Sequence, residues 1–155
     1  MVERIVMRRI LLLGAFLSAA FSTPAVMYLG DGCGCCGEHA KYLRQNGFEV
    51  SQKKDNFRAH RDGFGVPNEL VSCHSTLIEG YVVEGHVPIE AIRWLLDQKP
   101  NVVGVAVPEM PIGSPGMEQG GETEDYYVYV IKKNGEKEPF ALYNGRKIVK
   151  KYKNF

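Results

Sequence analysis

The sequence predicts a single α/β domain that opens with a strand–helix–strand unit. Residues 26–29 have the composition of a short strand that ends at a glycine loop, and residues 48–53 alternate apolar and polar side chains as a half-buried strand does. Between them the pattern is helical from Gly37 onward, with Leu43 on the apolar face and Gly47 placed to end the helix. This order of elements is typical of α/β domains.

The later elements continue this pattern and are expected to complete a mixed sheet. The stretch "STLIEGYVVEG" holds two short β-rich runs around Glu79-Gly80, which predicts a hairpin. Apolar side chains recur at helical spacing between Pro88 and Pro100, so a helix is expected there. A strand follows at residues 101–107, and Asn134-Gly135 is a strong signal for a C-terminal β-hairpin.

The composition is that of one globular domain. The chain has 155 residues, of which 45% are hydrophobic and 24% charged, which is enough for one hydrophobic core. The formal net charge is only +1, so the charge balance gives no reason to expect a nucleic-acid partner.

The N-terminus predicts export. Three arginines precede an apolar run from Ile10 to Phe21. A membrane-spanning helix needs roughly 20 apolar residues, so this run is short for an anchor and suits a signal peptide. We therefore expect a signal segment at residues 1–25, cleaved between 20 and 25, a folded domain at 26–145 and a basic tail at 146–155. The chain would touch a membrane only through the signal segment, if that segment were left uncleaved.

Three of the four cysteines lie in the motif "CGCC", from Cys33 to Cys36. Cys33 and Cys36 form a C-x-x-C step at the start of the predicted helix, where unpaired backbone N–H groups and the helix dipole lower the pKa of a thiol. Thioredoxin-like oxidoreductases use this arrangement, with the first thiol as nucleophile and the second as resolving thiol. A thiolate is also the form that binds metal, so this step leaves both functions open.

Cys35 favours metal binding over disulfide exchange. An exchange enzyme needs one attacking and one resolving thiol, and an adjacent third thiol invites unproductive disulfides. Three thiolates repel one another, and a soft cation such as Cu(I) relieves that repulsion by bridging the sulfurs. Zinc in a zinc-stabilised interaction module is a second alternative, for which Cys73-His74 offers only a cramped second pair of ligands.

Further candidate ligands lie downstream. His74 lies in "SCHST" and His86 in "EGHVP". Met110 and Met117 lie in a loop rich in proline and glycine, and thioether sulfur suits Cu(I). His39, one turn after the cysteines, is expected on the surface of the helix.

Three separated motifs carry a family resemblance. They are "CGCC" at residues 33–36, "GVPNELVSCHSTLIEGYVVEGHVP" at residues 65–88, and "GVAVPEMPIGSPGME" at residues 104–118. In this order they resemble the CopG-type periplasmic copper-resistance proteins, a family long catalogued as a domain of unknown function. The resemblance implies a thioredoxin-like fold, a periplasmic location, copper binding through clustered cysteines and a role in copper tolerance that can include cycling between Cu(I) and Cu(II).

Carried over residue by residue, the resemblance implies a metal site. Its thiolate ligands for Cu(I) would be Cys33, Cys35, Cys36 and Cys73, and its outer or alternative ligands would be His74, His86, Met110 and Met117. Copper is thus the expected ion, with zinc as the weaker candidate, and other periplasmic copper-handling proteins are the expected partners. A metal-binding protein is favoured over an enzyme; as an enzyme, the chain would be an oxidoreductase.

Two positions depart from the family pattern. Glu109 stands where many members carry glycine before the first loop methionine, and Gln119 stands where another methionine is common. The second departure argues against an extension of the site by further methionines.

Overall fold

The computed structural model describes residues 22–54 and 57–154 and confirms the α/β class for them. The elements are β1 (Thr23–Leu29), α1 (Gly34–Gln45), β2 (Phe48–Lys53), α2 (Phe57–Gly63), the 3₁₀ helix η1 (Asn68–Leu70), β3 (His74–Ile78), β4 (Tyr81–Glu84), α3 (Ile89–Gln98), β5 (Val102–Ala106), β6 (Asp125–Lys132), β7 (Lys137–Asn144) and β8 (Lys147–Lys151). Residues 1–21 of the predicted signal segment lie outside the described residues. None of the described helices has the length and apolar character needed to cross a membrane.

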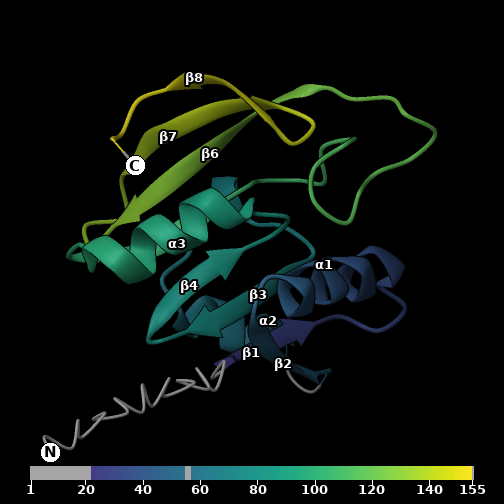
Figure 1. Ribbon diagram of the computed structural model, residues 1–155. Coiled ribbons are helices and arrows are strands. Elements are labelled where there is room, and N and C mark those ends of the chain that lie inside the picture. The colour runs from purple at the N-terminus through teal and green to yellow at the C-terminus, as the bar shows by residue number, and fades with distance from the viewer. Residues whose placement is uncertain (1–21, 55–56, 155) are drawn as a thin grey trace, which may run out of the picture.

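The strands form one mixed sheet of 8 strands in the order β2-β1-β3-β4-β5-β6-β7-β8 (Figure 1). β1 pairs in parallel with β2, and β4 with β5, because a helix connects the two strands of each pair. The other neighbouring strands are antiparallel. This order places β1, β3 and β4 side by side. The predicted cysteine and histidine ligands follow β1, lie at or just before the start of β3, or follow β4, whereas the two methionines follow β5.

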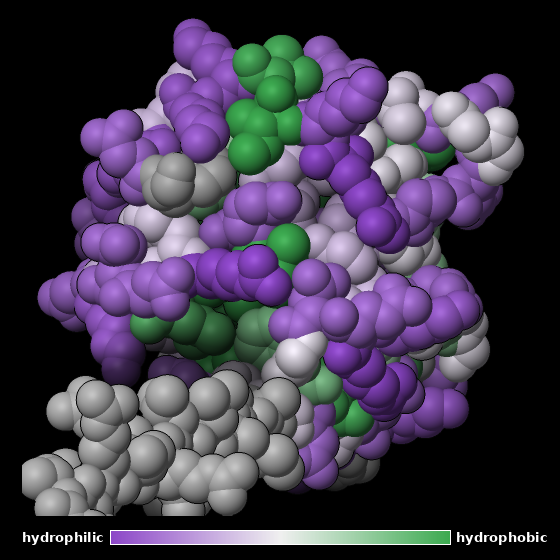
Figure 2. Space-filling view, in the orientation of Figure 1, coloured by the Kyte–Doolittle hydropathy of each residue, from purple (hydrophilic) through white to green (hydrophobic). Residues whose placement is uncertain are grey.

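The two faces of the sheet are covered by different elements. Leu43 of α1 and Leu95 of α3 belong to the main core, together with Val105 of β5. The next residue of β5, Ala106, packs instead in a small second cluster with Leu70 of η1. Since successive side chains of a strand point to opposite faces, α1 and α3 cover one face and η1 the other. The surface seen in Figure 2 is mostly hydrophilic, with hydrophobic residues in separate patches.

Most predicted elements are present, and three of them differ at their boundaries. Both predicted hairpins form, and the Glu79-Gly80 turn has the two positive φ angles, 49° and 83°, of a two-residue hairpin loop. β1 begins at Thr23, earlier than predicted. α1 begins at Gly34 with Cys33 as its N-cap, so the motif enters the helix itself and not a preceding loop. The segment predicted as a basic tail contains β8, which pairs with β7.

The long loop between β5 and β6, residues 107–124, carries the two methionines. The hydroxyl of Ser72, just before β3, donates a hydrogen bond to the carbonyl oxygen of Glu109 in this loop. Farther along, Gly116 lies so close to α1 that a Cβ atom there would be 2.6 Å from the backbone nitrogen of His39. The loop therefore reaches from the start of β3 to the first turns of α1.

Glu109 has a left-handed backbone conformation, with a φ of 62°. A residue with a Cβ atom is disfavoured there by roughly 1–2 kcal/mol, whereas glycine adopts this conformation freely. We expect Glu109→Gly to raise the free energy of unfolding by about 1 kcal/mol, measured by urea denaturation. Glu109→Ala is the matched control, because it removes the carboxylate and keeps the Cβ atom. Equal stabilisation by the two variants would show that the charge, and not the backbone, is responsible.

Gly116 and Gly121 form a second matched pair. Both have positive φ angles, 86° and 82°, but an added Cβ collides with α1 only at Gly116 and meets nothing within 4 Å at Gly121. We expect Gly121→Ala to lower the free energy of unfolding by about 1 kcal/mol and Gly116→Ala by roughly 2–4 kcal/mol, because overpacking adds to the backbone cost. Thermal and urea denaturation would measure both values, and equal losses would contradict the close packing of the loop on α1.

Candidate metal centre

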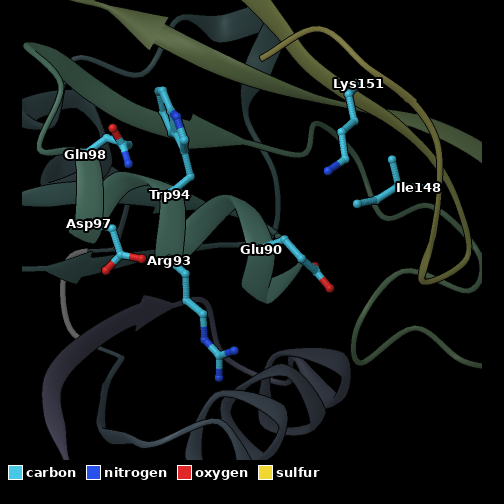
Figure 3. A pocket seen from close by; sticks show the side chains of 7 residues that line it. All are labelled: Glu90, Arg93, Trp94, Asp97, Gln98, Ile148 and Lys151. Carbon is cyan, nitrogen blue, oxygen red and sulfur yellow. The ribbon is translucent and has the colours of Figure 1, made fainter. Parts of the chain in front are cut away.

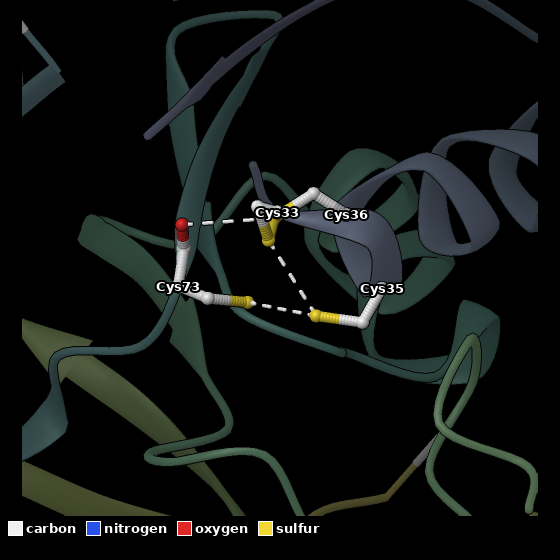
Figure 4. A group of neighbouring side chains, drawn as sticks. All are labelled: Cys33, Cys35, Cys36 and Cys73. Carbon is white, nitrogen blue, oxygen red and sulfur yellow. Dashed lines mark hydrogen bonds between the residues drawn. A yellow bond between two sulfur atoms is a disulfide. The ribbon is translucent and has the colours of Figure 1, made fainter. Parts of the chain in front are cut away.

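Four sulfur atoms gather where α1 begins (Figure 4). Cys33 and Cys36 form a disulfide across the first turn of the helix, and Cys36 is fully buried. Cys35 and Cys73 are free thiols of intermediate exposure. The Sγ atom of Cys35 lies 3.5 Å from that of Cys33 and 3.8 Å from that of Cys73. The C-x-x-C pair is therefore oxidised here, and the other two thiols lie beside it.

Strand pairing explains how Cys73 reaches the cysteines of α1. β1 and β3 are antiparallel, and His74, the first residue of β3, pairs with Leu29, the last residue of β1. The chain just before β3 therefore lies beside the chain just after β1, which leads into α1.

Two buried histidines flank the sulfur of Cys73. Its Sγ atom lies 3.2 Å from Nδ1 of His74 and 3.2 Å from Nε2 of His86. His86 follows β4, and the chain turns toward β3 at Gly85, whose φ is 74° and whose N–H donates to the carbonyl oxygen of His74 at 2.9 Å. A Cβ atom on Gly85 would collide with the carbonyl oxygen of Val107, so glycine is required at this position.

Burial keeps this group of side chains uncharged. Desolvation lowers the pKa of both His74 and His86, and neighbouring histidines lower that of His74 further. Desolvation raises the pKa of Cys73 to about 12, and the nearby Cys35 adds to that rise. At neutral pH the imidazoles are therefore neutral and the thiol is protonated. A cation that displaces the thiol proton would meet donor atoms that are already in place.

The structure brings Met110 to the cysteines, whereas the described contacts of Met117 are made by its backbone. The Sδ atom of Met110 lies 3.9 Å from Sγ of Cys35, and its side chain is 48% exposed. The N–H of Met117 donates to the carbonyl oxygen of Ser114 at 2.8 Å, and its carbonyl oxygen accepts from Gly113 at 3.0 Å. These two backbone hydrogen bonds of Met117 stabilise the turn in the loop.

The prediction that His39 lies on the helix surface is wrong. Its side chain is fully buried, and its Nδ1 atom lies 2.8 Å from Nε2 of His74. Desolvation, followed by the effect of His86, lowers the pKa of His39 to about 3. The β5–β6 loop covers this side of α1, which sequence reasoning did not anticipate. The sequence does contain a feature that indicates this burial. His39 follows Cys36 by three positions and precedes Leu43 by four, so the three side chains share one face of the helix, and the other two are buried.

Sequence reasoning also missed a buried carboxyl group beside the site. Glu84 accepts hydrogen bonds from the backbone N–H of Ser72, at 2.8 Å, and from the hydroxyl of Ser75. These two serines flank Cys73-His74, so Glu84 fixes the backbone that carries both side chains. Burial raises the pKa of Glu84 to about 7, although both hydrogen bonds act in the opposite direction. The sequence feature that indicates burial of Glu84 is its position directly after the apolar run "YVV".

A separate groove of about 380 Å³ lies between α3 and β8 (Figure 3). It is lined by Glu90, Arg93, Trp94, Asp97, Gln98, Ile148 and Lys151. The lining contains acidic and basic side chains and includes none of the predicted ligands, so this groove is distinct from the cysteines and histidines.

Within residues 22–54 and 57–154, two overlapping groups of donor atoms could hold a metal ion. One consists of Cys33, Cys35, Cys36 and Cys73, the other of Cys73, His74 and His86, and in each group the donor atoms lie within 4.8 Å of one another. Cys73 belongs to both groups. While the disulfide is closed, the second group keeps all its donors, whereas the first has lost two thiols.

Comparison with known proteins agrees with this chemistry. A family model described as "Protein of unknown function, DUF411" matches residues 70–117. No curated protein sequence matches the chain. Two solved structures are similar, "Copper resistance protein copG- Form 1" at 38% identity and a TM-score of 0.75, and "Copper resistance protein copG- Form 2" at 37% and 0.74. The matches cover 80% and 79% of this chain and 99% and 98% of those chains. The resemblance seen in the motifs is confirmed, and the chain belongs to the CopG copper resistance protein family.

Proposed function

We propose that the chain is an exported copper-binding protein of copper tolerance, which holds Cu(I) through its clustered cysteines. Membership of the CopG family supports copper as the metal. The observation that carries the proposal is the position of the Cys73 sulfur, 3.8 Å from the thiol of Cys35 and 3.2 Å from each of two imidazole nitrogens. Soft sulfur donors of this kind select Cu(I), and imidazole suits copper as well.

In the proposed cluster all four cysteines are ligands. Cys33 and Cys36 become available when a cellular dithiol reduces their disulfide; two electrons and two protons then convert it to two thiols, and the dithiol becomes a disulfide. Binding of Cu(I) displaces the thiol protons. Shared copper ions then offset the repulsion between neighbouring thiolates, which supports a cluster over a single bound ion.

The remaining ligands are proposed from the imidazole and thioether groups. His74 and His86 would serve Cu(I) or Cu(II), because imidazole binds both. Met110 would be an outer ligand beside Cys35, from which its sulfur is 3.9 Å away. Met117 is proposed on the family motif alone. A mixed set of this kind supports a role in Cu(I)/Cu(II) cycling, with ions exchanged among other periplasmic copper-handling proteins.

A thioredoxin-like fold and export complete the proposal. The strand order β2-β1-β3-β4, the parallel pairing of β1 with β2, and the C-x-x-C step at the start of α1 support that fold. The basic and apolar N-terminus supports a signal segment. The N–H of Thr23 donates to the carbonyl oxygen of Gly47 at 3.0 Å and Ala25 lies in the core, so cleavage before Thr23 would leave β1 intact.

Cys35→Ser tests the cluster. The reduced protein without its signal segment would be titrated anaerobically with Cu(I) against a competing chelator, and bound copper counted by mass spectrometry. We expect the unchanged protein to hold more than one copper ion per chain and the variant to hold fewer, because one bridging thiolate is lost. Gly37→Ser is the control, since it adds a hydroxyl to the same part of α1 at an exposed position. Unchanged stoichiometry in Cys35→Ser would refute the cluster, and no copper retained at all would refute the proposed function.

A second candidate function, thiol–disulfide exchange, is favoured by the closed disulfide itself. Cys36 is fully buried whereas Cys33 is partly exposed, so an incoming thiolate can reach Cys33 and release Cys36 as the leaving thiolate. For this function we expect Cys33→Ser to abolish oxidation of a reduced dithiol probe, followed spectroscopically, and Cys35→Ser to change its rate little. Equal losses in both variants, or no exchange by the unchanged protein, would exclude it.

A further inference from the structure

The buried histidines form a chain of contacts that begins at a backbone carbonyl. Nε2 of His39 lies 3.2 Å from the carbonyl oxygen of Val87, and its Nδ1 lies 2.8 Å from Nε2 of His74. Nδ1 of His74 in turn lies 3.2 Å from Sγ of Cys73. His39 and His74 are both fully buried, so water does not compete for these positions.

A carbonyl oxygen can only accept a hydrogen bond, and this fixes where the protons lie. Nε2 of His39 must carry the proton and donate to Val87. A neutral imidazole has one N–H, so Nδ1 of His39 accepts, and Nε2 of His74 must donate to it. The Nδ1 atom of His74 is then unprotonated, with its lone pair directed at the sulfur of Cys73.

A second carbonyl has the same effect on His86. Nδ1 of His86 lies 2.9 Å from the carbonyl oxygen of Pro115 and must donate to it. Its Nε2 atom is therefore unprotonated and also faces the sulfur of Cys73, at 3.2 Å. Two nitrogen lone pairs thus meet one thiol, which has a single proton and can satisfy only one of them. A cation at this point would satisfy both nitrogens and the sulfur together.

We propose that His39 is a positioning residue that fixes the tautomer of His74, so that the Nδ1 lone pair of His74 faces Cys73 before any metal binds. The described polar contacts of His39 are with His74 and the carbonyl oxygen of Val87, so it acts through His74. Hydrogen bonds of this kind orient a ligating imidazole and raise its basicity, and their loss costs about 10–100-fold in metal affinity. The identity of the ion as copper rests on the proposed function, whereas the tautomer does not.

The first test reads the tautomers without metal. Long-range ¹H–¹⁵N correlation spectra of the ¹⁵N-labelled, metal-free protein at neutral pH show which ring nitrogen of each histidine carries the proton. We expect Nε2–H in His39 and His74 and Nδ1–H in His86. A proton on Nδ1 of His74 in the unchanged protein would overturn the inference, whatever the protein binds.

The second test changes the acceptor. His39→Phe keeps the ring volume and removes the acceptor for His74, whereas His39→Asn can place a carbonyl oxygen close to the former Nδ1. We expect His39→Phe to move the His74 proton toward Nδ1 and to weaken Cu(I) binding about 10–100-fold, with His39→Asn restoring both to near the original values. His60→Phe is the control, because the His60 ring packs at a tilt against Tyr28, with the centroids 4.3 Å apart, and takes no part in the described contacts that join Val87, His39, His74 and Cys73.

The outcomes separate a positioning role from packing and from the proposed function. Weakened binding in both His39 variants with the His74 tautomer unchanged would overturn the inference, because packing alone would then explain the loss. If His39→Phe fails to fold, the spectra of the unchanged protein and of His39→Asn still decide the tautomer. Expected tautomers in a protein that binds no copper would support the inference and refute the proposed function.

Discussion

The antiparallel pairing of β1 with β3 is the constraint on which the candidate site depends. The pairing of Leu29 with His74 places the chain that leaves β1 for α1 beside Cys73. A slip of one residue would turn every side chain of β3 to the opposite face. The buried side chains of Met27 and Ile78 exclude such a slip, since both belong to the main core. The positions of the sulfur and nitrogen donors therefore depend on the packing of the sheet.

Burial then determines which ions this arrangement can hold. A buried cation is costly unless nearby groups neutralise its charge. The imidazoles near Cys73 are neutral, so among the proposed ligands negative charge can come only from thiols that lose their protons. With the disulfide closed, two free thiols are available, Cys35 and Cys73. Reduction adds two more, so the charge that the proposed site can neutralise rises with the reduction of the C-x-x-C pair.

Local patterns in the sequence were sufficient for most elements but not for contacts between distant segments. Alternation predicted β2 with its observed ends, and the glycine turns predicted both hairpins. The start of β1 was missed because Thr23 and Ala25 also suit a signal cleavage site. The start of α1 was missed because glycine, here Gly34, is more typical of loops than of helices. Residue types identified the cysteines and histidines as donors. Their distances depend on strand pairing, and the burial of His39 depends on a loop more than 70 positions away.

The β5–β6 loop shows how backbone strain and the site are connected. Glu109 holds a left-handed conformation that favours glycine, and the hydrogen bond from Ser72 to its carbonyl oxygen helps to hold it there. The next residue, Met110, is thereby placed beside Cys35 with nearly half of its side chain exposed. The donors therefore run from an exposed thioether, through half-buried thiols, to buried imidazoles. An ion held as proposed would exchange from its sulfur side, because the nitrogen side is closed by packing and fixed by backbone carbonyls.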